Sequence, residues 1–393
     1  MNKKTIRDID LAGKRVLVRV DYNVPVKDGL VTDTLRIVAG KPTLDYLLAR
    51  GCALVLISHL GEPKEGFEEK FSLAPVAKAA GEVLGREVRF IADCLGDEAA
   101  TAASGLKPGE IILLENLRFH PEETANDGEF AKALASYGDI YVNDAFAADH
   151  RSHASLVAIT QFLPSVAGLL VEKEVQTITE AIDNPTRPLV AIIGGAKIDS
   201  KIEVIKNLIP RVNALFIGGA MANTFLAAQG FAVGKSLYEA DELEVAKDIM
   251  GQASLAEIQF LLPIDVVVTD NLETASIVRT VLAQNVGEND IIADLGPDSV
   301  AQLAELLSQK GTVIWNGPLG ITETPVFASG SAAMGKLIVD SGATSIIGGG
   351  DTAGYIDGAG LHDKFSLVST GGGASLELMS GKKLPGVEAL LDL

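Results

Sequence analysis

Acidic, amide and basic side chains follow the apolar runs in the first half of the chain. In order, these positions hold Asp21 and Asn23, then His59, Arg118 and Arg151. The planar guanidinium of arginine matches phosphate and carboxylate groups in bidentate fashion, so this set suits a small anionic ligand. Loop arginines and histidines are often merely solvated, and it is their recurrence after successive runs that favours a binding site.

Glycine follows the apolar runs in the second half. The chain has 40 glycines in 393 residues, above the average share of about 7%. Glycines between a strand and a helix let backbone N–H groups approach phosphates at the helix N-terminus. One such pair would ordinarily mark only a tight turn, but recurrence at successive run ends favours a nucleotide. The clusters lie at 194–195, 218–219, 296–297, 316–318, 348–351 and 371–373.

Two lysines and an aspartate add charge to the glycine-rich half. Lys197 and Lys201 lie four residues apart at the start of a predicted helix, which would put both ammonium groups on one face. Such lysines repel each other and the helix dipole, so we expect an anion between them; a solvated surface pair is the alternative. Asp351 follows three glycines and is suited to hold Mg²⁺ with phosphates, because Mg²⁺ prefers oxygen ligands.

Motifs of other chemistries fail on their spacing. The stretch 230–236 is close to a P-loop, but it has three residues instead of four between its glycines and follows a predicted helix. The sequence has no GxGxxG between a strand and a helix. Five histidines and two cysteines show no zinc-ligand spacing. Without a nucleophile elbow, hydrolase chemistry also finds no support.

The elements that must position these residues alternate between strands and helices. Short runs rich in Val, Ile and Leu are each followed by helical spacing, which predicts parallel sheets built from βαβ units. In such sheets, ligands bind just beyond the carboxyl ends of the strands. The predicted strands are 15–20, 53–58, 88–92, 111–115, 140–143, 189–193, 214–217, 264–269, 291–294, 312–315, 344–347 and 365–369.

Helical periodicity covers 72–84 and 298–309, and Asp298 or Ser299 could cap the first turn of the second helix. A third helix, over 166–182, ends at a proline-rich stretch that stops it. We expect this third helix to join the two halves and to act as a hinge.

The charge balance excludes polyanionic surfaces as partners. The chain has 33 Lys and Arg against 52 Asp and Glu, a net charge of -19, which argues against nucleic acid and anionic membranes. No apolar run approaches the roughly 18 residues of a membrane span, so we expect a cytoplasmic protein. Cys52 and Cys94 lie in or beside apolar stretches and are predicted to be buried free thiols.

Longer strings of the sequence resemble one family in one order. They are VRVDYNVPVKDG (18–29), ISHLGEP (57–63), LLENLRFHPEE (113–123), NDAFAADHRSHAS (143–155), GLLVEKEV (168–175), VAIIGGAKIDSKI (190–202), FIGGAMANTFLAAQG (216–230), VGKSLYE (233–239), WNGPLG (315–320), IGGGDT (347–352) and STGGGASLELMSGKKLPG (369–386). The chain thereby resembles phosphoglycerate kinase of the bacterial type from end to end, without large insertions.

The resemblance implies an α/β fold with two lobes, each a doubly wound, Rossmann-like parallel sheet flanked by helices. Residues 1–170 would bind phosphoglycerate, with the segment from about 380 to 393 packing back on them, and residues 171–379 would bind the nucleotide. The implied enzyme is a cytoplasmic monomer without nucleic-acid or membrane partners. It transfers a phosphoryl group, with Mg²⁺, from 1,3-bisphosphoglycerate to ADP, giving 3-phosphoglycerate and ATP.

The resemblance also implies a role for each matching residue. Phosphoglycerate would bind Asp21, Asn23, Arg36, His59, Arg118 and Arg151. The nucleotide would bind Gly194, Gly195, Lys197, Lys201, Gly218, Gly219, Asn316, Pro318, Glu323, Gly348, Gly349, Gly350, Asp351 and Thr352, with Asp351 on Mg²⁺. Arg36, Lys197, Gly350 and Gly373 would act on the migrating phosphoryl group.

The chemistry needs no general base, because a carboxylate acceptor is already deprotonated at pH 7. Catalysis of this direct in-line transfer then rests on positioning and charge stabilisation. Because the substrates bind separate lobes, we expect the lobes to close and to expel water.

Several positions depart from the family pattern. Glu62 stands where the family usually has Arg, and Asp149 adds a second carboxyl group in a stretch that usually reads FGTAHR. We expect both to add negative charge beside the anion site and to weaken phosphoglycerate binding. Thr322 stands where the family commonly has Phe. Asp199 and Ser200 stand in the order Asp-Ser, whereas the family more commonly has Ser-Asp. An alternative is a catalytically impaired, nucleotide-binding regulatory protein on the same scaffold.

Overall fold

The chain divides into two compact units. A computed structural model describes residues 1–64 and 66–393. Met1–Gln176 and Lys383–Leu393 form the first unit, and Thr177–Lys382 form the second. The change between units falls inside helix α6 (Leu169–Asp183). The boundary predicted between 170 and 171 lies in the same helix, and the ligand assigned to each unit remains a prediction.

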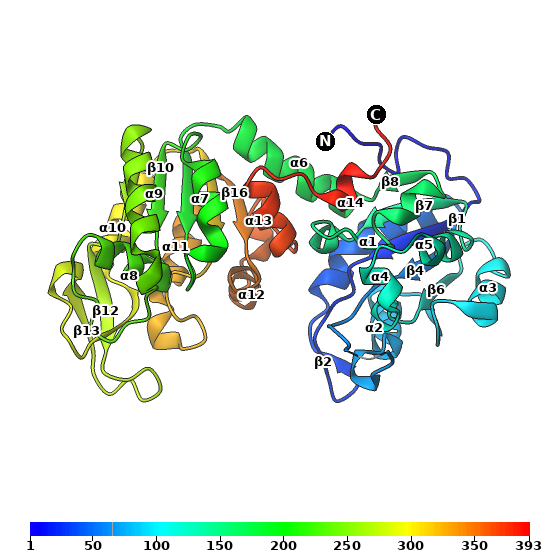
Figure 1. The fold of residues 1–393 in the computed structure, drawn as a ribbon, viewed down its shortest axis with the longest axis horizontal. Coiled ribbons are helices and arrows are strands. Elements are labelled where there is room, and N and C mark those ends of the chain that lie inside the picture. Colours follow the sequence, from blue (N-terminus) through cyan, green and yellow to red (C-terminus); the bar gives the residue numbers. More distant parts are fainter. Residues whose placement is uncertain (65) are drawn as a thin grey trace. The chain divides into compact units, whose positions relative to one another are not determined.

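The first unit is built on a six-stranded parallel sheet with strand order β5-β6-β4-β1-β7-β8 (Figure 1). Its strands are β1 (Arg15–Val20), β4 (Ala53–Ile57), β5 (Arg89–Ile91), β6 (Ile111–Leu114), β7 (Ile140–Asp144) and β8 (Ser165–Ala167), and β2 (Val26–Lys27) pairs with β3 (Leu30–Val31) as a hairpin. Its helices are α1 (Leu35–Leu48), α2 (Ala74–Leu84), α3 (Gly96–Ser104), α4 (Pro121–Thr124), α5 (Gly128–Ala135) and α14 (Pro385–Glu388), with the beginning of α6. Every residue of β4 and β7 is buried, as expected when helices cover both faces of a parallel sheet.

The second unit holds another six-stranded parallel sheet, with order β11-β10-β9-β15-β16-β17. Its strands are β9 (Leu189–Ile193), β10 (Ala214–Ile217), β11 (Gln259–Leu261), β15 (Thr312–Asn316), β16 (Thr344–Gly348) and β17 (Leu367–Val368). Its helices are α7 (Ile202–Leu208), α8 (Gly219–Ala228), α9 (Leu243–Leu255), α10 (Pro297–Leu306), α11 (Ser329–Ser341), α12 (Gly350–Gly358) and α13 (Gly373–Met379). Strand order reverses between β9 and β15, and this switch point is where such sheets bind ligands. The α/β fold with two doubly wound parallel sheets is thus confirmed.

None of the helices in the described ranges is both long and apolar enough to cross a lipid bilayer.

A separate antiparallel sheet corrects part of the prediction. β12 (Asp265–Thr269) pairs with β13 (Val278–Leu282) on one side and β14 (Ile291–Leu295) on the other. The strands predicted at 264–269 and 291–294 therefore exist but do not belong to the parallel sheet. The linking strand β13 was missed because most of its side chains are exposed, so it carries no apolar run.

Helix α10 begins differently from the prediction. Neither Asp298 nor Ser299 is its N-cap, since the helix starts at Pro297. Instead the buried carboxylate of Asp265 accepts the backbone N–H groups of Asp298 (3.1 Å) and Ser299 (2.7 Å). The Ser299 hydroxyl also donates to that carboxylate (2.7 Å). A side chain from β12 thus satisfies the first turn and ties the antiparallel sheet to α10.

Replacing Ser299 with alanine should therefore destabilise the second unit. The variant loses a buried hydroxyl that bonds a buried carboxylate, so we expect a loss of about 1–3 kcal/mol of unfolding free energy. Chemical denaturation followed by circular dichroism measures it, and Ser308→Ala, at an exposed position just after the same helix, is the control. Equal stability of the two variants would contradict this role.

Candidate functional site

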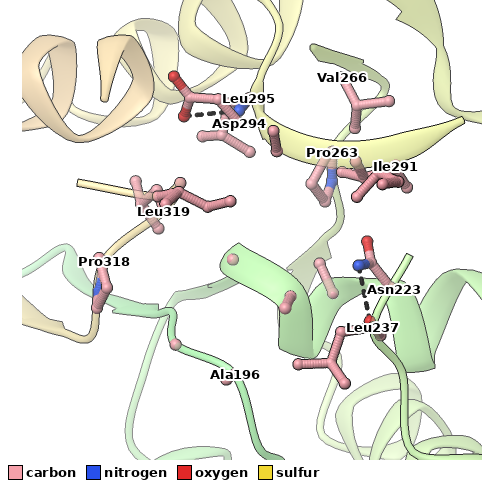
Figure 2. Close-up of a pocket in the computed structure, with 18 of the residues that line it drawn as sticks. Ala196, Asn223, Leu237, Pro263, Val266, Ile291, Asp294, Leu295, Pro318 and Leu319 are labelled. Carbon is pink, nitrogen blue, oxygen red and sulfur yellow. Dashed lines mark hydrogen bonds between the residues drawn. The ribbon is translucent and has the colours of Figure 1, made fainter. Parts of the chain in front are cut away.

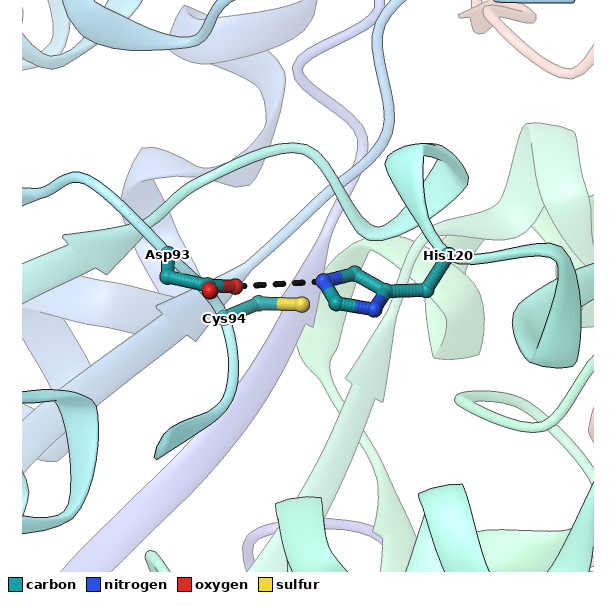
Figure 3. Close-up of side chains that lie close together, drawn as sticks. All are labelled: Asp93, Cys94 and His120. Carbon is teal, nitrogen blue, oxygen red and sulfur yellow. Dashed lines mark hydrogen bonds and ion pairs between the residues drawn. The ribbon is translucent and has the colours of Figure 1, made fainter. Parts of the chain in front are cut away.

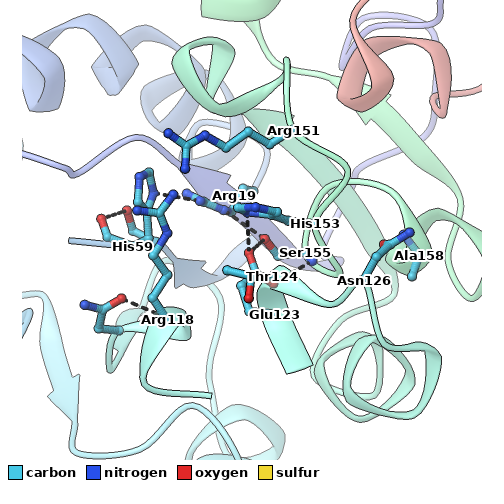
Figure 4. A network of polar contacts seen from close by, with 12 residues as sticks. Arg19, His59, Arg118, Glu123, Thr124, Asn126, Arg151, His153, Ser155 and Ala158 are labelled. Atoms are coloured by element: carbon cyan, nitrogen blue, oxygen red, sulfur yellow. Dashed lines mark hydrogen bonds and ion pairs between the residues drawn. The ribbon is translucent and has the colours of Figure 1, made fainter. Parts of the chain in front are cut away.

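Three arginines and a histidine gather at the carboxyl edge of the first unit's sheet (Figure 4). We call Arg19, His59, Arg118 and Arg151 the arginine cluster. Arg19 lies on β1, His59 follows β4, Arg118 follows β6 in a 3-10 turn, and Arg151 follows β7. Because β6, β4, β1 and β7 are successive neighbours in a parallel sheet, their carboxyl ends meet at one edge. The three predicted members of the cluster therefore do come together.

Arg19 was not predicted, although it organises the cluster. Its side chain is buried (1% exposed) and donates to Ser155 Oγ (3.0 Å), to His59 Nδ1 (2.8 Å) and to the carbonyl oxygen of Val20 (2.6 Å). Ser155 in turn donates to the buried carboxylate of Glu123 (2.6 Å). The sequence signal was an arginine inside an otherwise apolar strand, because a buried charge needs dedicated partners.

Burial and positive charge keep the nearby histidines neutral. Burial, with help from Arg19 and Arg118, holds the pKa of His59 well below its usual value. The same causes lower the pKa of His153 to about 4, with burial again the largest. Because Nδ1 of neutral His59 accepts from Arg19, its proton resides on Nε2, which can then donate to a ligand.

Arg118 is anchored by a hydrogen bond at one of its side-chain nitrogens. Its Nη1 donates to the carbonyl oxygen of Gly61 (2.7 Å), and burial followed by repulsion from Arg151 lowers its pKa to about 10. It therefore stays charged at neutral pH. Within residues 1–64 and 66–393, its buried Nε has no hydrogen-bond partner. A buried donor in a positive environment suits an anionic ligand.

Glu62 supplies a carboxylate to this cluster. Its Oε1 lies 3.6 Å from Nη1 of Arg118 and 3.7 Å from Nη1 of Arg151, although its side chain is 77% exposed. The expectation that Glu62 adds negative charge beside the anion site agrees with this geometry. Because Glu62 is well solvated and both separations exceed hydrogen-bond length, these ion pairs are weak, so an incoming anion can displace Glu62.

The other residues predicted for this site lie in an adjoining network. Arg36 donates to the buried carboxylate of Asp21 (2.8 Å), and the Asn23 side-chain oxygen accepts the backbone N–H of Gly61 (2.9 Å). Gly61 also accepts from Arg118, so Asn23 and the arginine cluster share one loop.

Two buried carboxyl groups stand behind the cluster. Burial raises the pKa of Asp144 to about 7, and its Oδ1 accepts the backbone N–H of Leu170 at the start of α6. Burial raises the pKa of Asp149 to about 8, and its Oδ1 accepts from Asn143 Nδ2 (2.6 Å). The expected negative charge from Asp149 beside the anion site is therefore wrong: this carboxyl is buried and largely protonated at neutral pH.

The second unit contains a pocket of about 500 Å³ at its switch point (Figure 2). Five residues predicted to bind the nucleotide line it: Gly195, Gly219, Pro318, Glu323 and Asp351. They follow β9, β10, β15 and β16, whose carboxyl ends meet at one edge of the sheet. The other residues predicted for the nucleotide, Gly194, Lys197, Lys201, Gly218, Asn316, Gly348, Gly349, Gly350 and Thr352, do not line it.

Apolar side chains that the sequence did not indicate form much of the pocket wall. They include Leu237, Val266, Ile291, Leu295, Leu319 and Ile321. Val266, Ile291 and Leu295 come from the antiparallel sheet, whose existence was not foreseen, and so this wall could not be foreseen either. Apolar walls with a few polar groups are typical of pockets for small organic ligands.

The glycine loops pack against one another beside the pocket. The backbone N–H of Gly195 donates to the carbonyl of Pro318 (2.9 Å), and that of Gly194 donates to Asn316 (2.8 Å). A Cβ on Gly194 would overlap the carbonyl oxygens of Gly317 and Pro318. Close approach of two loops, rather than only contact with a ligand, therefore requires glycine at 194.

The two lysines do not share a helix face, which corrects that prediction. Helix α7 begins at Ile202, after a 3-10 turn over Asp199–Lys201. Lys201 is buried and donates to the side-chain oxygen of Asn316 (2.5 Å), whereas Lys197 is exposed. Burial lowers the pKa of Lys201 to about 8, and the nearby charge of Asp351 opposes that shift.

Asp351 lies in the first turn of α12, where Gly349 at φ 90° supplies a left-handed N-cap that favours glycine. Asp351 is exposed and lines the pocket, whereas Thr352 is buried and accepts the backbone N–H of Gly317 (3.0 Å). Gly350 and Gly373 are the first residues of α12 and α13.

Comparison with known proteins gives one consistent family. The family model described as phosphoglycerate kinase matches residues 6–382. Phosphoglycerate kinase of Pelotomaculum thermopropionicum is 46% identical over 392 residues, covering 100% of both chains. That of Herpetosiphon aurantiacus is 49% identical over 393 residues, also covering 100% of both. The solved phosphoglycerate kinase from Coxiella burnetii superposes with a TM-score of 0.89 at 39% identity, covering 98% of each chain.

The buried Asp149 predicts a pH dependence that Asp149→Asn should remove. Its pKa rises from 3.8 to about 8 on folding, so its contribution to stability is complete below about pH 4 and is lost as pH rises through about 8. As pH rises from 6 to 9, the melting temperature of Asp149→Asn should therefore increase relative to that of wild type. We expect this relative increase to be at least about 2–4 °C, the shift that a stability change of about 1 kcal/mol produces. The exposed Asp45→Asn serves as control. A difference that is constant with pH would contradict the burial effect.

Proposed function

The chain belongs to the phosphoglycerate kinase family, and on that premise we propose which residues bind each substrate and which transfer the phosphoryl group. Its activity is the reversible transfer of a phosphoryl group from 1,3-bisphosphoglycerate to ADP, which gives 3-phosphoglycerate and ATP. The observation that carries the assignment of residues is one candidate ligand region per unit, each at the carboxyl edge of a parallel sheet. The monomeric state and the cytoplasmic location remain predictions from the sequence.

We assign phosphoglycerate to the arginine cluster of the first unit, with Asp21, Asn23 and Arg36. The buried Nε of Arg118, which has no hydrogen-bond partner among the described residues, and the Nε2–H of His59 support this, because both are donors positioned before a ligand arrives. Arginine forks suit the phosphate and carboxylate groups of this substrate. Arg19 acts as a positioning residue, since each of its three side-chain nitrogens already donates to a protein group.

We assign the nucleotide to the pocket of the second unit. Its apolar wall suits a base, the exposed Glu323 can accept hydrogen bonds from ribose hydroxyls, and the glycine loops with the N-terminus of α12 suit phosphates. Lys201 and Asn316 lie directly behind the glycine loops. We propose that Lys201 contributes positive charge there, although its ammonium group donates a hydrogen bond to the Asn316 side-chain oxygen in the free protein.

Asp351 is the residue we propose to hold Mg²⁺. Its exposed carboxylate lines the pocket at the N-terminus of α12, and Mg²⁺ commonly takes one or two protein carboxylates together with substrate phosphates. The ion would neutralise charge on the phosphates during transfer. Lys197 and Arg36, with N–H groups at Gly350 and Gly373, would stabilise the migrating group.

A coupled assay with 3-phosphoglycerate and MgATP tests the function. We expect turnover that EDTA abolishes and excess Mg²⁺ restores, and that falls with added salt because the binding groups are charged. Nucleotide binding without any turnover would instead support the impaired regulatory protein.

Removing the carboxylate of Glu62 should tighten phosphoglycerate binding. Glu62→Gln frees Arg118 and Arg151 from a competing anion, and Glu62→Arg adds a cation. Because an exposed ion pair contributes only about 0.2–1 kcal/mol, we expect KM for 3-phosphoglycerate to fall about 1.5- to 5-fold in Glu62→Gln. KM for ATP should not change in Glu62→Gln. In the control Glu82→Gln, at an exposed position, KM for 3-phosphoglycerate should also stay at the wild-type value. An unchanged KM for phosphoglycerate would show that Glu62 does not compete.

Removing the ammonium group of Lys197 should slow the transfer step itself. We expect kcat of Lys197→Ala to fall by about 10²-fold or more, the effect of losing one group that stabilises transition-state charge. Lys206→Ala removes a partly exposed lysine from α7, paired with Asp248, and should keep near wild-type turnover. If both variants turn over at wild-type rate, the role given to Lys197 is wrong.

A further inference from the structure

Three side chains with metal-binding atoms gather at the sheet edge of the first unit, outside the groups assigned to phosphoglycerate (Figure 3). Asp93 and Cys94 come just after β5, and His120 follows β6 by way of the 3-10 turn Leu117–Phe119. β5 and β6 are paired in parallel, so their carboxyl ends deliver these residues to one place. The sequence alone suggested no such site, because the ligands come from two strand ends rather than from one motif.

The distances suit a tetrahedral metal ion. One carboxylate oxygen, Cys94 Sγ and a ring nitrogen of His120 all lie within 4.8 Å of one another. Asp93 Oδ1 and His120 Nε2 are 3.1 Å apart. Metal bonds of 2.0–2.2 Å to nitrogen and oxygen give a tetrahedral edge of about 3.3 Å, so this pair is already near the required separation. With a zinc-to-sulfur bond of about 2.3 Å the edge to the sulfur is about 3.6 Å, so the thiol needs to move by no more than about 1 Å to complete three ligands.

Neighbouring contacts hold two of the three ligands in place. Asp93 Oδ1 accepts the backbone N–H of Leu95 (3.1 Å), which fixes the carboxylate and leaves the second lone pair of that oxygen for a metal. The ring of His120 lies against that of Phe130, with 5.5 Å between centroids. Cys94 is fully buried, whereas Asp93 and His120 are partly exposed, so an ion can enter from their side.

The charge around the thiol also favours a cation. Asp93, Glu123 and Glu115 all act on Cys94 as negative charges, in addition to the effect of its burial.

We propose that Asp93, Cys94 and His120 form a binding site for Zn²⁺, with water as the fourth ligand. Thiolate, imidazole and carboxylate are the ligands that this ion takes in proteins, and three protein ligands leave one open position. The bound ion deprotonates the thiol, and the proton passes to solvent. The site would also tether the turn that carries Arg118, and it does not depend on the function assigned above.

Titration of the full chain with Co²⁺ tests this site. Reduced protein is used without oxygen and with Mg²⁺ in excess, so that sites made of carboxylates alone are filled. We expect one equivalent of Co²⁺ to produce a thiolate-to-cobalt charge-transfer band in the near ultraviolet, and Zn²⁺ to remove it by displacement. The absence of this band in the wild-type protein would overturn the proposal.

Variants identify the ligands. Cys94→Ser should abolish the band, while Cys52→Ser should keep it, because Cys52 is the other buried thiol and donates to Leu11 O (3.1 Å) instead. Asp93→Asn and His120→Gln change partly exposed residues and should weaken Co²⁺ affinity at least about tenfold, with circular dichroism confirming the fold. A full band in Cys94→Ser, or unchanged affinity in both Asp93→Asn and His120→Gln, would refute the site.

Discussion

Parallel strand pairing is the constraint on which both substrate regions depend. In the first unit, the neighbouring strands β6, β4, β1 and β7 end at one edge and bring together arginines more than 100 residues apart in sequence, such as Arg19 and Arg151. In the second unit, β10, β9, β15 and β16 bring their glycine loops to one pocket. A register shift of one residue would turn the side chains of a strand to the opposite face, so the hydrophobic cores that fix register also fix the sites.

Local charge, not the net charge of -19, sets the electrostatic environment at these edges. Arg19 is buried and donates hydrogen bonds to other protein groups. Burial first, and then the positive charge of Arg19 and Arg118, lowers the pKa of His59 and His153. Like charges held this close oppose folding unless an anion is present, and Glu62 partly fills that role in the free protein. In the second unit, Lys201 is buried behind glycine loops, where burial alone lowers its pKa.

The sequence was sufficient to predict which residues lie at the ends of strands. It was insufficient to predict contacts and burial that arise from tertiary packing. The gathering of His59, Arg118 and Arg151 at one sheet edge, and of Asp351 at the other, could be predicted because each lies in the loop or turn that follows an apolar strand. Arg19 was missed because it sits inside a strand, where its partners come from distant loops. The shared face of Lys197 and Lys201 was wrong because the helix begins later, and the charge given to Asp149 was wrong because burial raises its pKa. The antiparallel sheet stayed hidden because β13 is mostly exposed.

Calorimetric titration of two single variants with each substrate tests most directly whether each sheet edge binds its own ligand. Full-length Arg118→Ala and Lys201→Ala are each titrated separately with 3-phosphoglycerate and with MgADP. The account predicts that Arg118→Ala loses at least about tenfold in affinity for 3-phosphoglycerate, the effect of about 1.4 kcal/mol, while it binds MgADP like wild type. Lys201→Ala should show the opposite pattern. Equal losses for both ligands in either variant would contradict two independently built sites.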